Sequence, residues 1–77
     1  MNKDRRKLIE KAVGLLSDAK ELIEQAAEEE QDYADNMPEN LQGSERHENA
    51  EQAASELCDC AGELESVIDT LHEIVSV

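Results

Sequence analysis

Apolar residues recur every three or four positions from about residue 3 to residue 35. Two rows share a seven-residue repeat and are expected to form the seam of a helix: Leu8, Leu15, Leu22, Ala12, Ala19, Ala26 and Tyr33. A third row widens the apolar stripe on one flank: Ile9, Leu16 and Ile23. This period predicts a long amphipathic helix whose apolar stripe is broader than a strict coiled-coil seam.

A second stretch, from about residue 44 to residue 76, repeats the same period. Its expected seam also has two rows: Ala50, Leu57, Leu64, Leu71, Ala54, Ala61, Ile68 and Val75. A third row again flanks the seam: Ala53, Cys60, Val67 and Ile74. The pattern predicts a second helix of about the same length.

Residues that break and cap helices separate the two stretches, at positions 36–43. Pro38 disfavours helical geometry at Met37 and can begin a new turn, which Asn36 is placed to cap. Gly43 suits a left-handed helix stop, and Ser44 is a good N-cap for the second helix. We therefore expect a short helical turn at positions 38–42.

A joint this short makes the two helices antiparallel, so the predicted fold class is all-α, a helical hairpin in a single domain. Met37 and Leu41 are expected to fold over its end. Two helices cannot bury a third apolar row on each of them, so a monomer would leave apolar side chains in water. The residues expected to drive self-association are Ile9, Leu16, Ile23, Val67 and Ile74. A homodimer forming a four-helix bundle is the expected result, and the groove of another protein is the alternative.

Charge is distributed unevenly along the chain. Twenty acidic residues against seven basic ones give a net charge of −13, and five of the basic residues precede residue 12. After residue 20, Arg46 is the only full positive charge against seventeen carboxylates. Such a surface repels nucleic acid and anionic membranes, and it attracts basic protein surfaces. No apolar run reaches the ~20 residues of a membrane span, and no secretion signal is evident, so we expect a cytoplasmic protein with reduced cysteines.

The densest run of carboxylates lies at the expected joint. Together with the only aromatic residue it forms the candidate partner-binding surface: Glu28, Glu29, Glu30, Asp32, Tyr33, Asp35 and Glu39. The alternative is a solvated face that only caps the hairpin, which is the commoner fate of charge runs. A net charge beyond the magnitude of ~2–8 that solubility requires favours a role in binding.

No group of residues makes a convincing catalytic or metal site. Cys58 and Cys60 are two positions apart, which on a helix points their thiols about 200° apart, and Cys60 is expected beside the core. Asp69 and His72 have the spacing of a di-metal carboxylate motif, but the facing helix offers leucine and alanine. His47 lies near the opposite end of the same helix from His72. We expect no metal, no cofactor and no enzymatic activity.

All-α magnesium-dependent nucleotide pyrophosphohydrolases provide an enzymatic alternative. Their Glu-Glu-x-x-Glu and Glu-x-x-Asp motifs are imitated by residues 28–32 and 56–59. Glu56 and Asp59 are expected on the outer face of the second helix, away from the seam where metal ions would lie. Chance matches of this kind are common in glutamate-rich helices.

The segment YADNMPENLQGSER at positions 33–46, after a basic start at positions 2–7, resembles short acidic helical-hairpin proteins of bacteriophages and prophages. The resemblance covers the whole layout, although the paired cysteines depart from it. It implies a phage or mobile-element origin and a two-helix fold, and it brings no catalytic residues. Small acidic phage proteins frequently act by occupying host proteins, including defence nucleases whose DNA-binding grooves are basic.

The expected function is therefore non-enzymatic binding of a basic surface on a host protein, without direct contact with nucleic acid or membrane. Inhibition of a nucleic-acid-binding defence factor, as a DNA mimic of the anti-CRISPR or anti-restriction kind, would be one such use. A structural or adaptor module that packs exposed apolar helix faces on another helix is the first alternative. The nucleotide hydrolase is the second.

Overall fold

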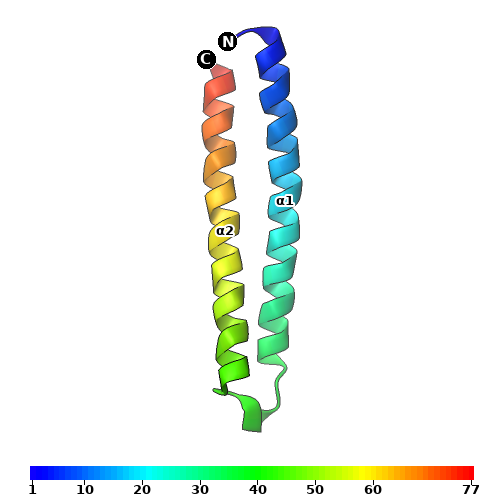
Figure 1. The fold of residues 1–77 in the computed structure, drawn as a ribbon, viewed down its shortest axis with the longest axis vertical. Coiled ribbons are helices and arrows are strands. Elements are labelled where there is room, and N and C mark those ends of the chain that lie inside the picture. Colours follow the sequence, from blue (N-terminus) through cyan, green and yellow to red (C-terminus); the bar gives the residue numbers. More distant parts are fainter.

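Two long helices lie side by side and antiparallel over almost the whole chain (Figure 1). The computed structural model describes residues 1–77. Helix α1 spans Lys3–Asp35, the 3-10 helix η1 spans Glu39–Leu41, and helix α2 spans Glu45–Ser76. The rod measures 60 × 14 × 13 Å, and both termini lie at the end opposite η1. The predicted all-α hairpin is confirmed, with a shorter turn at the joint than expected.

Neither helix has a stretch that is both long and apolar enough to span a membrane.

A side-chain cap and one arginine fasten the terminal end of the rod. The side chain of Asn2 caps α1 by accepting a hydrogen bond from the Arg5 backbone N–H at 2.9 Å. The Arg6 guanidinium donates to the carbonyl oxygens of Val75 at 2.6 Å and Val77 at 2.8 Å. Carbonyls at the end of a helix have no partner within the helix, so these bonds satisfy them and hold the first turn of α1 against α2.

Small side chains dominate the thin core between the helices. Only 8 of 77 residues are buried, and the apolar ones are Ala27, Ala34, Met37, Ala50, Ala54, Ala61 and Ile68. Alanine lets two helix backbones approach closely, so dispersion contacts compensate in part for the lack of large side chains. The seam predicted for α2 is confirmed, because its remaining members are half-buried: Leu57, Leu64, Leu71 and Val75.

The seam predicted for α1 is wrong in its leucine row, which lies one position along the helix from the row that faces α2. Three residues expected inside are instead mostly exposed: Leu8 at 69%, Leu15 at 63% and Leu22 at 67%. The half-buried residues include those expected on the flank, Ile9, Leu16 and Ile23, together with Ala12 and Ala19 of the predicted seam. A shift of one residue turns the buried stripe by about 100°. Ile9, Leu16 and Ile23 are therefore partly covered within the hairpin and offer less surface for self-association than expected, whereas Val67 and Ile74 are exposed as expected.

Residues near the joint explain which stripe of α1 faces α2. The observed stripe continues from Ile23 through Ala27 and Ala34 to Met37, and the last three are buried. The predicted stripe continues instead to Tyr33, which stays 49% exposed. The alanines of α2 at this height bring the two helix backbones close together. The narrow space between them admits small side chains and excludes a phenol ring.

One charged residue interrupts the seam of α1. Lys20 is half-buried, and its Nζ lies 3.3 Å from Glu24 Oε1 on the same helix and 3.5 Å from Glu65 Oε2 on α2. The hydrogen bond to Glu24 is the largest cause that raises the pKa of Lys20 above its ordinary value of 10.5, and Glu65 acts in the same direction. Desolvation opposes both. The ion pair between helices fixes their relative height in this part of the rod.

Two glycines should respond to alanine in opposite directions. Gly43 has φ of +79°, in the left-handed region, where a Cβ atom is strained, so Gly43→Ala should lower the free energy of unfolding by about 1–2 kcal/mol. Gly14 lies within α1, and a Cβ added there meets no atom within 4 Å, so Gly14→Ala should raise it by about 0.5–1 kcal/mol. Urea unfolding followed by circular dichroism measures both. A Gly43→Ala protein as stable as Gly14→Ala would refute the left-handed stop.

Candidate functional site at the joint

Side-chain hydrogen bonds hold the joint between the helices. Gln42 Nε2 donates to the carbonyl oxygens of Met37 at 2.9 Å and Ala34 at 3.4 Å. Asn36 Nδ2 donates to the carbonyl oxygen of Asp32 at 2.8 Å, so Asn36 closes the end of α1. The expectation that Asn36 caps the next turn is wrong, because Pro38 occupies that position. The carbonyls of Asp32 and Ala34 also accept backbone N–H groups, from Asn36 at 2.9 Å and Met37 at 3.3 Å, so the side-chain amides reinforce the bonds that close the end of α1.

His47 fastens the other side of the joint to α2. The Gly43 backbone N–H donates to His47 Nδ1 at 3.3 Å, so the ring proton lies on Nε2, which is 3.1 Å from Glu51 Oε1. The His47 backbone N–H donates to Ser44 Oγ at 3.2 Å, which confirms Ser44 as the N-cap. His47 is 8% exposed as a residue, and both ring nitrogens have a partner. This residue therefore organises the backbone of the joint.

A small apolar cluster lies beneath these hydrogen bonds. It consists of Ala34, Met37 and Ala50, which are buried together where α1, the joint and α2 converge. Met37 covers the end of the hairpin as expected, whereas Leu41 is 38% exposed and does not. Side-chain hydrogen bonds and this apolar cluster thus hold the joint in place, while Leu41 remains on its surface.

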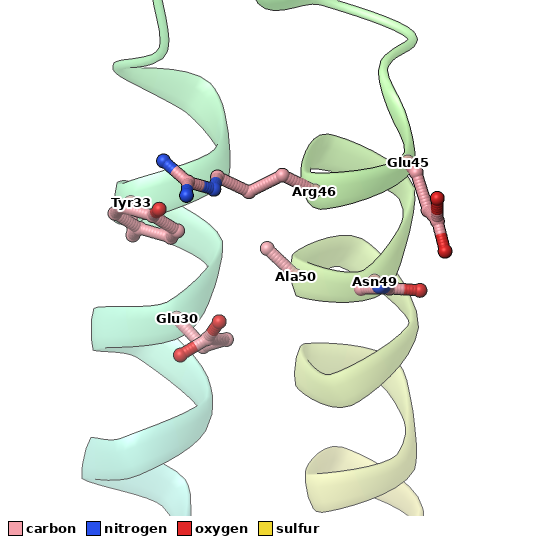
Figure 2. Close-up of a pocket in the computed structure, with 6 residues that line it drawn as sticks. All are labelled: Glu30, Tyr33, Glu45, Arg46, Asn49 and Ala50. Atoms are coloured by element: carbon pink, nitrogen blue, oxygen red, sulfur yellow. The ribbon is translucent and has the colours of Figure 1, made fainter.

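A shallow groove crosses from α1 to α2 next to the joint (Figure 2). Its lining residues are Glu30, Tyr33, Glu45, Arg46, Asn49 and Ala50. Arg46 extends from α2 toward Tyr33 on α1. A neighbouring hollow shares Tyr33 and Arg46 and adds Asn36, Met37, Pro38 and Leu41. Tyr33 and Arg46 are both exposed, so they offer a phenol ring and a guanidinium to a partner.

The predicted acidic surface surrounds the end of α1 and does not form one flat face. Glu30 and Tyr33 line the groove beside Arg46, whereas Glu28 and Asp32 line a hollow that also contains Cys58. All the predicted carboxylates are exposed except Glu30, which is half-buried. None of them takes part in an ion pair, since the close contacts to carboxylates in the chain are those of Lys20 with Glu24 and Glu65 and of His47 Nε2 with Glu51. The joint end consequently keeps its negative charge.

The other candidate residues do not come together. Cys58 and Cys60 are free and exposed, so the expectation that Cys60 lies beside the core is wrong. Its row on α2 turns toward water once the alanine rows occupy the seam. Glu56 and Asp59 are exposed on α2. No three His, Cys, Asp or Glu side chains are grouped as ligands for a metal ion.

Sequence reasoning overlooked the parts played by Gln42, Arg46 and His47. A spacing of four residues between Gly43 and His47 gave a signal, because a side chain one turn into a helix can reach back to the residue before its N-cap. Gln42 gave none, since its carbonyl partners on α1 become neighbours only when the joint has folded.

Replacing each of the two histidines by alanine should distinguish the residue that fastens the joint from one at an exposed position. His47→Ala removes the acceptor of the partly buried Gly43 N–H and should lower the free energy of unfolding by about 0.5–1.5 kcal/mol. His72→Ala changes the same residue type on the same helix at an exposed site and should have little effect. Urea unfolding of the two variants makes the comparison. Equal losses would show that His47 does not fasten the joint.

Comparisons of the chain with protein-family models, with curated proteins and with solved structures give no match. The resemblance to phage hairpin proteins stays a prediction from the sequence. The functional interpretation rests on the geometry and charge of the joint and of the helix faces.

Proposed function

We propose that this protein acts without catalysis, by binding a basic surface of another protein through the joint end of the hairpin. The observation that carries the proposal is a joint fixed by side-chain hydrogen bonds that presents Tyr33, Leu41 and Arg46 among carboxylates without ion-pair partners. Two antiparallel helices can be connected by a short loop with none of these bonds. The additional order therefore supports a role in recognition.

Preorganisation lowers the entropic cost of binding. Gln42, His47 and Ser44 hold the backbone of the joint, so its exposed side chains begin from a fixed frame. Tyrosine and arginine are among the residues that most often dominate binding energy, because both bury a large planar surface and still make directed polar contacts. Tyr33 and Arg46 line the same groove and are suited to this part.

The electrostatics of α1 favour the same interpretation. The C-terminal end of a helix carries partial negative charge, which basic side chains in the last turn usually offset. The last turn of α1 has no basic residue and contains Asp32 and Asp35. The adjacent N-terminus of α2 is positive, but Glu45 and Glu48 already lie in its first turn. This concentration of negative charge is unfavourable for the isolated hairpin and favourable for capture of a basic partner.

The class of partner follows from this charge. A protein that itself binds nucleic acid has a groove rich in lysine and arginine, and exposed carboxylates can take the place of phosphates there. Inhibition of a host defence factor of this class is the use that we propose. The other surface of the rod, an apolar face, requires a different kind of partner and is treated below.

Neutralising the joint end should weaken binding far more than neutralising the terminal end. A triple variant, Glu28→Gln, Asp32→Asn and Glu39→Gln, removes three exposed charges worth roughly 0.2–1 kcal/mol each, so affinity should fall about tenfold. The matched control removes three exposed charges of α2 at the other end: Glu63→Gln, Asp69→Asn and Glu73→Gln. A protein captured from host lysate by the wild-type chain is purified, and its affinity for each variant is measured by calorimetry.

Salt should act in the same direction on the wild-type complex. Raising the ionic strength from about 0.01 M to 0.1 M shortens the screening length from ~30 Å to ~10 Å, so the association rate should fall steeply. Tyr33→Ala should shorten the lifetime of the complex, because it removes an anchor and no charge. Equal effects of the two triple variants, or an affinity independent of salt, would refute binding through the joint.

A further inference from the structure

One long face of the rod is apolar and open to water. On α1 it carries two rows at heptad spacing, the exposed leucines and a row of small residues between them and the seam: Leu8, Leu15, Leu22, Ala12, Ala19 and Ala26. On α2 the exposed Val67 and Ile74 belong to one row with Cys60. Exposed apolar residues on a protein surface are usually scattered and need no explanation. Three exposed leucines aligned along one side of a helix form a patch, and such a patch indicates a contact surface.

The groove at the joint shows that these rows share one side of the rod. Tyr33 and Arg46 line that groove together (Figure 2). Tyr33 continues the row of Ala12, Ala19 and Ala26 at seven-residue intervals, and Arg46 continues that of Cys60, Val67 and Ile74. The seam keeps a seven-residue period through Ala27 and Ala34, so the neighbouring rows keep it as well. The apolar face is therefore continuous across both helices.

The opposite side of the rod is polar. Its hollow is lined by Glu24, Glu28, Gln31 and Asp32 from α1 and by Ser55 and Cys58 from α2, around Ala27 and Ala54 of the seam. The contact of Lys20 with Glu65 lies along the rows that pass through this hollow. Only one of the two long sides of the hairpin is thus suited to cover another apolar surface.

We propose that a second copy of this chain covers the apolar face, with α1 packed antiparallel on α1 of that copy about a two-fold axis between Leu15 and Ala19. The order of residues along the two rows of α1 carries this choice: Arg5, Leu8, Ala12, Leu15, Ala19, Leu22, Ala26 and Glu29. Large and small residues alternate, and the charges at the two ends are opposite. When the series is placed beside a second copy running in the opposite direction, each large residue therefore faces a small one and each charge faces its opposite.

Antiparallel pairing in this register matches both size and charge. Leu15 meets Ala19 of the second copy, Leu8 meets Ala26, and Leu22 meets Ala12, so that each leucine fills the space above an alanine. Arg5 then meets Glu29 of the second copy at both ends of the contact. Parallel pairing of the same rows would bring Arg5 against Arg5 and Glu29 against Glu29. The sequence of the face thus selects the antiparallel arrangement.

The area of such a contact is that of a small but specific interface. The rod is 14 Å broad, and an overlap of roughly 40 Å then covers on the order of 560 Å² per copy, or about 1,100 Å² in total, just above the ~1,000 Å² expected of a biological interface. The rod is 60 Å long, so the joint ends project beyond the overlap at opposite ends of the dimer. Apart from Glu29, which belongs to both, the residues of the pairing differ from those of the acidic surface at the joint, so the two proposals are tested by different variants.

Sedimentation equilibrium of the full chain over a concentration series tests the pairing. The wild type should be a dimer at micromolar concentration, and Leu15→Glu should raise the dissociation constant at least tenfold, because it places two like charges beside the two-fold axis. Gln25→Glu adds the same charge on an exposed, outward position of α1 and should leave the dimer intact. Circular dichroism checks that the helices persist, and Leu22→Gln is a milder second variant. A monomeric wild type, or a Leu15→Glu protein that dimerises normally, overturns the proposal and assigns the face to a different protein.

Charge exchange tests the antiparallel register. Arg5→Glu alone and Glu29→Arg alone should each weaken the dimer several-fold, because each places like charges opposite one another. The double variant should recover most of the wild-type affinity, since Glu at position 5 again meets Arg at position 29 of the second copy. A double variant as weak as both single changes combined would overturn the antiparallel register.

Discussion

A two-helix hairpin has a single seam, and whichever stripe of α1 enters it, the other apolar residues of that helix remain outside. Here the seam takes Ile9, Leu16 and Ile23 with the small residues near the joint. The consequence is that the three largest apolar side chains of the competing stripe stand in water. The exposed leucine row is thus a direct result of how the core was formed, and a fold with two helices offers no other element to cover it.

The thinness of the core makes the ends of the rod important. Few side chains are buried, so alignment of the helices relies on contacts at defined heights: Arg6 on the last carbonyls of α2, Lys20 with Glu65, and the bonds of Gln42 and His47 at the joint. Each of them joins residues far apart in the sequence or closes a helix end. Together they fix one register where alanine rows alone would permit sliding.

The two proposed surfaces have different physical characters and share only Glu29. The joint end is negative and rigid, and it would recognise a partner mainly by charge, whereas the long face is apolar and self-complementary. On the proposed antiparallel pairing, the dimer would carry one joint at each end. Two linked sites gain avidity only where a partner or its assembly presents two basic surfaces at that separation. A single groove would use one joint and leave the other free.

The sequence by itself determined the two helices, their bounds, the left-handed stop at Gly43, the cap at Ser44 and the seam of α2, because these depend on local propensity and on periodicity. It also located the acidic run at the joint, since the residue types alone fix where charge lies along the chain. The tertiary structure decided which of two adjacent stripes of α1 faces α2. Both stripes are apolar and differ by one position, so the choice depends on which side chains fit against the alanines of the other helix. It likewise decided that Gln42 fastens the joint, because its side chain reaches the carbonyl of Ala34 on α1 only after the chain has begun to turn back.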